Sequence, residues 1–256
     1  MKTKISIIIA FTLIGTYVFA QQLTKAGPYT IKASEKFETP KHFALTNPMG
    51  YQGKGIIVPT NRGFKGFNFQ LFDAKTLKKQ KENTVETEGK FPEGCSFPWF
   101  QKMKSHTFYC MRQVFRDTKT EGISVLEFDP DKMDFTGVVR NLFQSSGPIR
   151  SGGGFSFGYS GTYGSGYDTY VSADRSKILF TYELKPKEKR DKLNSDVIGM
   201  YVFDDNMKKL WGDEFEMPYT EAKMNNMDYA IGSDGKVYFL AQVYEGDDPK
   251  QGRDKK

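Results

Sequence analysis

The strongest candidate for chemistry in this sequence is a glycine-rich stretch, SGGGFSFGYSGTYGSGYD, at residues 151–168. Within it, GFSFG at residues 154–158 matches the G-x-S-x-G pattern that carries the nucleophile of many serine hydrolases. The same glycines could instead cradle a phosphate group with backbone N–H groups, or connect two parts of a β-rich chain. The elements on either side decide among these interpretations.

Those elements do not support catalysis by Ser156. A nucleophile elbow needs a helix after the serine, but YSGTYGSGYDTY follows, and its glycines and aromatic residues disfavour a helix. Both histidines, His42 and His106, precede the serine, whereas α/β-hydrolases order their triad as serine, acid and histidine. A phosphate loop would need G-x-x-x-x-G-K-[ST] before a helix, which is missing from the sequence. We therefore predict that residues 151–168 are a connection, and that Ser156→Ala leaves any activity intact.

Other candidate sites are weak as well. The segment DPDKMD at residues 129–134 offers three carboxylates to a calcium ion, but it lacks the glycine and terminal glutamate of an EF-hand. Phe97, Trp99 and Phe100 could line a ligand surface, although core packing is the more common role of such residues. We predict no catalytic, cofactor-binding or metal-ligating residue, and no cofactor.

The first twenty residues have the layout of a secretory signal peptide. Lys2 and Lys4 precede an apolar run from residue 5 to residue 18, and Val18 and Ala20 occupy the −3 and −1 positions of a cleavage site before Gln21. The apolar run is short for a membrane-spanning helix, and no later run is long enough. We expect an exported protein in the periplasm, the cell envelope or the extracellular space, without a membrane span after cleavage.

Charge and composition narrow the class of partner. The chain carries 37 Lys and Arg against 31 Asp and Glu, and one basic cluster at residues 185–192 lies among acidic residues. A nucleic-acid surface should show a basic stripe with exposed aromatic residues. We expect no nucleic-acid partner, and a protein, peptide or glycan ligand is compatible with the sequence. Aromatic residues make up 15% of the chain, which together with frequent glycine favours β-structure.

The two cysteines, Cys95 and Cys110, leave two alternatives open. In an oxidising compartment they could form a disulfide if they lie on neighbouring strands. They could equally be two buried, unpaired thiols. Sequence does not decide between these states.

The sequence contains a degenerate internal repeat. Alternating apolar residues lead into Phe-Asp three times, followed each time by a polar turn and a second strand-like run; the aspartates are Asp73, Asp129 and Asp204. VSADRSKILF and AIGSDGKVYF form a second recurring pair, with turns around Asp174 and Asp234. Aspartate closes such turns by accepting backbone N–H groups, so both patterns predict hairpins.

Joined in order, the two patterns make a four-stranded antiparallel unit. Such units are expected at residues 42–85, 93–145 and 167–219, and residues 224–245 supply the first two strands of a fourth. A repeated four-stranded meander is typical of a β-propeller. The predicted fold is therefore all-β and propeller-like, with about three and a half blades, and a β-sandwich is the alternative.

The turns SADRSKILF and GSDGKVYF resemble the S-x-D-G-K turn of TolB-like and WD40-like propeller repeats of bacterial envelope proteins. The sequence departs from WD40 proper, because LWGDE separates Trp211 from Asp213 by a glycine. The resemblance implies a single propeller-like domain over residues 21–256. Closed propellers have four to eight blades, so we expect this domain to be incomplete at its C-terminus or to form an open arc.

The resemblance implies a binding or scaffold module of the cell envelope whose ligand is not specified. The alternatives are a glycan- or ester-processing hydrolase at the propeller channel, and a structural fragment of a larger envelope protein. The sequence favours a non-enzymatic role, since a hydrolase would need acidic or histidine side chains that converge in one pocket. The sequence specifies neither the oligomeric state nor the total blade number.

Overall fold

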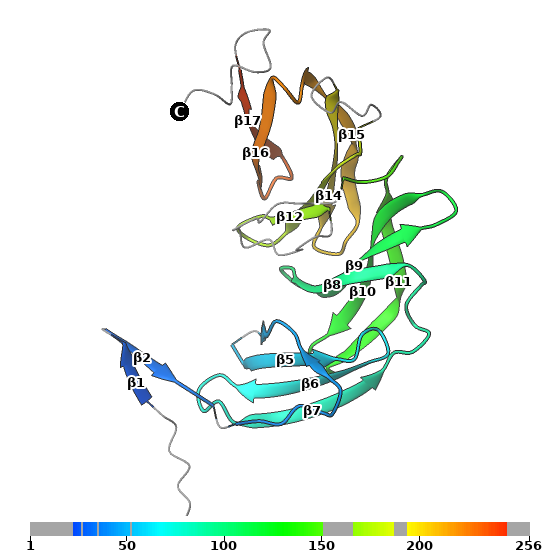
Figure 1. Cartoon of the computed structure of the whole chain (residues 1–256). Helices are drawn as coiled ribbons and strands as arrows, with labels where there is room; N and C mark the ends of the chain where they lie inside the picture. Colours follow the sequence, from blue (N-terminus) through cyan, green and yellow to red (C-terminus); the bar gives the residue numbers. More distant parts are fainter. Residues whose placement is uncertain are drawn as a thin grey trace, which may run out of the picture.

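The structure is a computed structural model that describes residues 23–26, 28–34, 36–51, 53–150, 166–186 and 194–244. In this part of the chain the regular elements are all β-strands. Apart from one two-stranded hairpin near the start of the described chain, the strands form four antiparallel sheets that follow one another along a curved path, and Figure 1 shows the resulting open arc. The chain is thus a partial β-propeller, as predicted, and not the two facing sheets of a sandwich.

The first sheet has a divided inner strand. β3 and β4 both pair with β5, and the order then continues through β6 to β7. Its strands are β3 (Ala44–Leu45), β4 (Met49–Tyr51), β5 (Gly55–Asn61), β6 (Gly66–Asp73) and β7 (Lys79–Glu86).

The second and third sheets are regular four-stranded meanders in chain order. The second contains β8 (Cys95–Lys102), β9 (Thr107–Phe115), β10 (Thr120–Asp129) and β11 (Asp134–Gln144). The third contains β12 (Tyr167–Val171), β13 (Lys177–Glu183), β14 (Ser195–Asp204) and β15 (Lys209–Thr220). These bounds confirm the predicted repeat units.

The fourth sheet has two described strands, β16 (Met224–Ile231) and β17 (Val237–Val243). A separate hairpin of β1 (Leu23–Ala26) and β2 (Tyr29–Lys32) precedes the first sheet. In Figure 1 this hairpin and the fourth sheet lie at opposite ends of the arc.

The repeated aspartates close their hairpins as predicted. Asp73 Oδ1 accepts the N–H groups of Lys75 and Thr76, at 3.0 and 2.7 Å. Asp204 Oδ1 accepts those of Asn206 and Lys208, each at 2.9 Å. In the other hairpin type, the N–H of the second residue after each aspartate bonds to Oδ1 of Asp174 or Asp234. Each turn is therefore fixed by residues adjacent in sequence.

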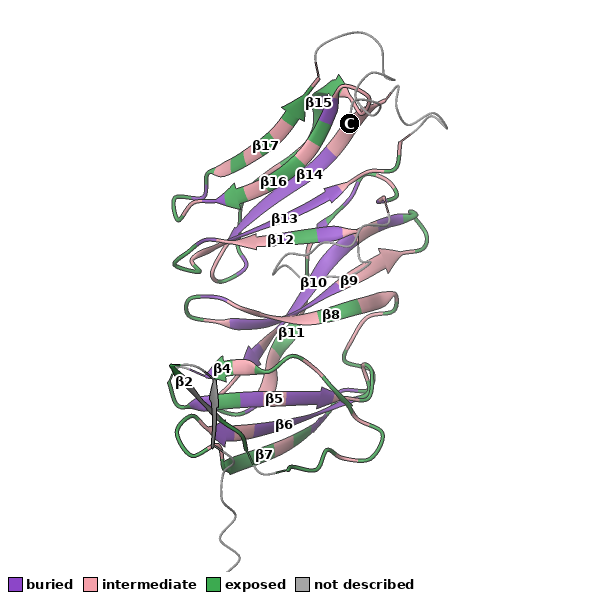
Figure 2. Cartoon of the chain, turned by 60° about the vertical axis from the view of Figure 1, so that its left-hand side comes forward, coloured by how far each residue is buried: buried purple, intermediate pink, exposed green. Residues whose placement is uncertain are grey.

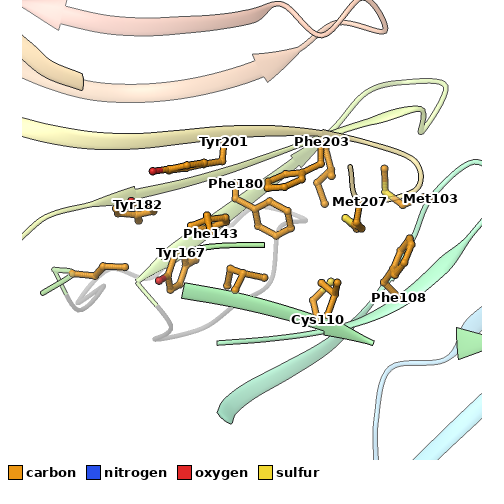
Figure 3. Packing of buried hydrophobic residues seen from close by; sticks show 14 residues of the cluster. Met103, Phe108, Cys110, Phe143, Tyr167, Phe180, Tyr182, Tyr201, Phe203 and Met207 are labelled. Carbon is orange, nitrogen blue, oxygen red and sulfur yellow. The ribbon is translucent and has the colours of Figure 1, made fainter. Parts of the chain in front are cut away.

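The core lies between sheets. Because side chains alternate along a strand, each inner sheet contributes to two clusters. On β9, Tyr109 and Met111 face the first sheet, whereas Phe108 and Cys110 face the third. Figure 3 shows the cluster between the second and third sheets, where the rings of Phe143 and Tyr201 stack with centroids 4.4 Å apart. A third cluster joins the third and fourth sheets.

This alternation settles the state of the cysteines. Cys95 and Cys110 lie on the neighbouring strands β8 and β9, and both are free thiols. Cys95 packs against the cluster shared with the first sheet, whereas Cys110 belongs to the cluster shared with the third. Their side chains are on opposite faces of one sheet, so a disulfide cannot form without rearranging the sheet.

Candidate functional site

In the sequence, the glycine-rich stretch falls between the last strand of the second sheet and the first strand of the third. β11 ends at Gln144 and β12 begins at Tyr167, so the segment connects two sheets, as the repeat predicted. Ser156 and the rest of residues 151–165 lie outside the described residues. Of the basic cluster at residues 185–192, the structure describes Lys185, which is exposed.

The DPDKMD segment is a hairpin turn. Asp129 Oδ1 accepts the N–H groups of Asp131 and Lys132, at 2.9 and 3.1 Å. The Asp131 carboxylate accepts a hydrogen bond from the Tyr51 hydroxyl and pairs with Lys54 Nζ at 3.3 Å. The segment therefore closes β10 onto β11 and ties the second sheet to the first. Within the described ranges, no group of three or more histidine, cysteine and acidic residues is arranged to hold a metal ion.

The two histidines and the aromatic residues near Trp99 lie in separate regions of the structure. His42 lies in a turn before β3, whereas His106 Nδ1 is 2.7 Å from Glu127 Oε1 on the second sheet. Phe100 and Trp99 pack against the clusters on either side of the second sheet. Phe97 remains 47% exposed, with the Arg112 guanidinium 5.8 Å from its ring centroid. These residues do not converge.

A different set of polar side chains does converge, between the third and fourth sheets. We call it the Arg150 cluster, and it gathers one basic, one amide and four acidic residues: Arg150, Asp168, Glu183, Asp196, Glu221 and Asn226.

The meander explains why these residues meet. Glu183 ends β13 and Asp196 lies near the start of β14, while Asp168 lies near the start of β12. Antiparallel strands bring these three positions to one end of the sheet. Glu221 directly follows β15 and Asn226 lies near the start of β16, which adds the fourth sheet at the same end.

Arg150 holds the cluster together. Its backbone N–H donates to the Glu183 carbonyl at 2.7 Å, and its Nη1 donates to Glu183 Oε2 at 2.8 Å. Arg150 Nη2 is also 3.7 Å from Glu221 Oε2. On the opposite side, Asn226 Nδ2 donates to Glu183 Oε1 at 3.0 Å and to Asp196 Oδ2 at 3.1 Å. Glu183 therefore accepts hydrogen bonds from both Arg150 and Asn226, and through Asn226 it links the third sheet to the fourth.

The electrostatics of the cluster distinguish its carboxylates. Burial raises the pKa of Asp196 to about 6, with further contributions from the charge of Glu183 and a hydrogen bond to it, against which Arg150 acts. Neighbouring atoms displace part of the water around the Asp168 carboxyl group, and this loss of solvent and the charge of Glu183 raise its pKa. Asp168 as a whole remains an exposed residue of β12. Burial lowers the pKa of Arg150, but Glu183, Glu221 and Asp196 outweigh it and raise the pKa overall. Proton exchange near neutral pH is thus available at Asp196.

Two tyrosines border these carboxylates. The rings of Tyr170 on β12 and Tyr229 on β16 are tilted, with centroids 5.5 Å apart, and Tyr229 stacks on Phe239 at 4.9 Å. Burial, together with the nearby Asp168 and Asp228, raises the pKa of Tyr170 to about 12. Burial and the carboxylates of the cluster also raise the pKa of Tyr229. Both tyrosines therefore present neutral hydroxyl groups at ordinary pH.

Two polar atoms of the cluster, Asn226 Oδ1 and Glu221 Oε2, are buried without a hydrogen-bond partner, although Glu221 Oε2 lies 3.7 Å from Arg150 Nη2. Asn226 Oδ1 is buried and unpaired, although its amide nitrogen donates twice. An unpaired buried acceptor costs about 1–3 kcal/mol, which a donor brought by a ligand would recover. The arrangement offers carboxylate and amide acceptors, a proton donor and aromatic faces, a combination suited to hydroxyl-rich ligands.

Sequence reasoning did not find this cluster, because its members are spread from residue 150 to residue 226 and meet through the meander. A usable signal is the position of acidic residues at the ends of predicted strands. Asp168 and Glu183 lie at the ends of strands of the third repeat, and Asp228 precedes the Asp234 turn by six residues as Asp168 precedes the Asp174 turn.

No protein-family model and no curated protein matches this chain. Among solved structures, the endo-arabinase from Bacteroides thetaiotaomicron is similar at 14% identity, with a TM-score of 0.39 over 86% of this chain and 82% of that one. The Dos1 propeller is similar at 11% identity and a TM-score of 0.38, over 76% of this chain and 41% of that one. A thermostable family-43 glycoside hydrolase is similar at 11% identity and a TM-score of 0.32, over 82% and 88%. The TolB-like and WD40-like resemblance remains a prediction, and the sheets themselves establish a partial β-propeller.

Proposed function

We propose that the protein is an exported binding module whose ligand is a glycan, bound at the Arg150 cluster. The observation that carries the proposal is the position of Asp168, exposed on the inner strand β12 beside Tyr170 and within the charge field of Glu183. Figure 1 has β12 on the concave side of the arc and β15 on the convex side. Asp168 is thus an exposed residue of a strand on the concave side.

The chemistry of the cluster fits sugars better than the other ligands considered. Carboxylate and amide oxygens accept hydrogen bonds from hydroxyl groups, and tyrosine rings provide apolar faces for sugar rings. Arg150 is committed to Glu183 and Glu221, so the remaining exposed groups are acceptors. A strongly anionic ligand would be repelled, because the three carboxyl groups of Glu183, Glu221 and Asp196 surround a single guanidinium.

Export to the cell envelope is part of the same proposal. It is supported by Lys2, Lys4, the apolar run at residues 5–18 and the small side chain of Ala20. N-terminal sequencing of protein recovered from a periplasmic or culture fraction should begin at Gln21. Recovery of uncleaved protein from the cytoplasm would contradict this part of the proposal.

Binding can be tested by isothermal titration calorimetry against a panel of soluble neutral polysaccharides. Asp168→Asn should weaken binding of any positive polysaccharide by about tenfold or more, because a charged acceptor contributes about 1.5–3 kcal/mol to a hydrogen bond. Asp117→Asn, an exposed change in the β9–β10 turn, is the matched control and should bind as the parent does. Binding that Asp168→Asn leaves intact would place the ligand elsewhere.

A second candidate function, glycan hydrolysis, is favoured by one observation. Asp196 has a pKa of about 6 and is hydrogen-bonded in a network with Glu183, which pairs with Arg150. A carboxyl group whose pKa lies near neutral pH can act as a general acid in glycoside hydrolysis.

Hydrolysis is distinguished from binding by reducing-sugar release on the polysaccharides that bind. The hydrolase function predicts release that is lost in Asp196→Asn while binding persists. Absence of release from every bound polysaccharide, between pH 4 and pH 8, would leave binding as the function.

A further inference from the structure

The turns that follow the Phe-Asp pairs each place an apolar residue in the left-handed region of backbone conformation. The residues are Leu77 in the first sheet, Met133 in the second and Met207 in the third, with φ angles of 57°, 55° and 57°. This conformation is uncommon for a residue with a side chain. Three equivalent examples therefore indicate one shared turn geometry, which directs this side chain in the same way in each sheet.

In the second and third sheets, this side chain fills the junction with the preceding sheet. Met133 is 0% exposed and belongs with Phe128 to the cluster shared with the first sheet. Met207 is 2% exposed and belongs with Phe203 to the cluster shared with the second sheet. The phenylalanine before the turn and the apolar residue within it thus both face the preceding sheet.

On the corresponding side of the first sheet, the described chain places the short segment of residues 36–38. The Phe37 ring packs on Phe72, the phenylalanine before the first turn, with centroids 4.9 Å apart. Gln70 Nε2, on the same face of β6 as Phe72, donates to the Glu38 carbonyl at 2.9 Å. A three-residue segment therefore stands where a whole sheet packs in the other two cases.

A pocket remains between this segment and the turn. It has a volume of about 500 Å³ and is lined by residues 36–38, Phe72 and residues 76–79. Leu77 is only partly buried there, unlike its two methionine counterparts. In Figure 2 the buried strand β6 gives way to the exposed strand β7, and the turn between them borders the pocket. Pockets of about 300–1,000 Å³ commonly hold small ligands.

The apolar part of the lining is aromatic. Phe72 is 6% exposed and Phe37 is 37% exposed, and their rings are inclined at 56° to each other. Aromatic rings favour offset or edge-to-face contacts, and two tilted rings offer a third ring both a face and an edge. The lining is therefore suited to a planar aromatic group.

The charged part of the lining has a positive excess, because it contains three lysines and one glutamate, Glu38. Lys79 Nζ is paired at 2.6 Å with a glutamate of β7 outside the lining. Neither Lys36 nor Lys78 forms an ion pair with a described residue. Asp73 also lies outside the lining, and its Oδ1 accepts N–H groups of the turn. Two unpaired lysines against Glu38 leave one positive charge, which a single carboxylate neutralises.

We propose that this pocket binds a small aromatic molecule that carries one carboxylate group. The ring packs against Phe37, Phe72 and Leu77, and the carboxylate pairs with Lys36 and Lys78. A ligand with two or more negative charges fits less well, because its surplus charge would be repelled by the lining glutamate. The site is separate from the Arg150 cluster, since it belongs to the first sheet and not to the third.

Equilibrium dialysis of the protein against 2-naphthoate tests the proposal. At pH 7 and about 0.15 M salt, charges farther than about 8 Å from the ligand are largely screened. We expect one site with a Kd of roughly 0.1–1 mM, as suits a ligand of this size. Lys78→Glu should weaken binding by about tenfold or more, because it replaces an attraction by a repulsion. Phe37→Ala should weaken it by about fivefold, because it removes one aromatic contact.

Lys75→Glu is the matched control. Lys75 is exposed in the same turn but is not part of the lining, and its substitution changes the net charge as Lys78→Glu does. It should bind within about twofold of the parent. Thermal melts check that each variant is folded. Equal weakening by the two charge reversals, or no saturable binding up to about 5 mM, would overturn the proposal.

Two further probes test the chemical class of the ligand. The amide 2-naphthamide keeps the ring without the charge, and octanoate keeps the charge without the ring. Each should bind about tenfold more weakly than 2-naphthoate, and equal binding of either would contradict the proposed class. Asp168→Asn should leave 2-naphthoate binding unchanged, so this proposal and the glycan site can fail separately.

Discussion

The junction between the second and third sheets and the junction between the third and fourth are built from similar residues but end in different states. In the first of these, Phe143 on the outer strand is 6% exposed and stacks on Tyr201. In the second, Trp211 and Phe215 on the outer strand remain 36% and 41% exposed. The inner halves of both junctions are buried alike, since Phe180 and Leu179, neighbours on β13, are each 0% exposed.

The aromatic residues of the outer strand are thus covered less completely beside the two-stranded fourth sheet than Phe143 is beside the third. Each outer strand nevertheless keeps one buried residue, and Val85, Phe143 and Met217 are 6%, 6% and 8% exposed, so the two-stranded sheet still covers part of β15. The stabilisation that a hydrophobic residue on an outer strand contributes therefore depends on how far the next sheet covers it. Single substitutions can measure this coverage at each junction.

We call the junction between the second and third sheets the closed junction, and the junction between the third and fourth sheets the open junction. The largest expected effect comes from the closed junction. Phe180 lies within 5.8 Å of the Phe143 ring and 5.7 Å of the Phe203 ring, centroid to centroid. Phe180→Ala should lower the free energy of unfolding by about 3–5 kcal/mol, because it leaves a buried cavity. Phe239→Ala, in the open junction, should cost clearly less. Equal shifts in urea titrations would refute the contrast between the junctions.

The next effect measures how tightly the closed junction is packed. A Cβ added at Gly199 would lie 2.2 Å from the ring of Tyr182, its register partner. Gly199→Ala should therefore destabilise the protein by about 1–3 kcal/mol. Gly147→Ala is the control, since a Cβ there meets no atom within 4 Å. A thermal melt that shows no difference between the two variants would mean that Tyr182 moves freely.

A pH-dependent effect is expected at Asp196, which lies in the Arg150 cluster between the third and fourth sheets. Burial and Glu183 raise the folded-state pKa of Asp196 to about 6, above its unfolded value near 4, so the folded state binds the additional proton. This contribution favours folding below pH 4 and is lost as the pH rises to 6. Asp196→Asn should therefore gain melting temperature relative to the parent between pH 4 and pH 7. Parallel curves over that range would contradict the raised pKa.

The smallest effect is expected on the outer face of the fourth sheet. Leu240 is 63% exposed, so Leu240→Ser should change the free energy of unfolding by less than about 0.5 kcal/mol. Urea titration measures this change in the free energy of unfolding. A loss above 1 kcal/mol would show that this face is covered, and the fourth sheet would then resemble the closed junctions.

The repeat could be predicted from sequence because its determinants are local. Alternation along each strand and an aspartate at each turn, such as Asp73 or Asp204, involve residues a few positions apart. The Arg150 cluster could not be predicted in this way. Glu183 on β13 and Asn226 on β16 are brought together by the course of four strands and the packing of two sheets, which no local pattern encodes. The split of the first inner strand into β3 and β4 could not be predicted for the same reason. It depends on pairing with β5, whose last two residues pair with β3 and whose first three residues pair with β4.

The placement of Cys95 and Cys110 on opposite faces of the second sheet has a consequence for how the protein is made. Burial raises the pKa of the Cys95 thiol to about 11 and that of Cys110 further, so both remain protonated and slow to react. Folding then requires neither an oxidant nor a disulfide isomerase. The same native chain should form in the reducing cytoplasm and outside the cell, and reducing agents should leave its melting temperature unchanged.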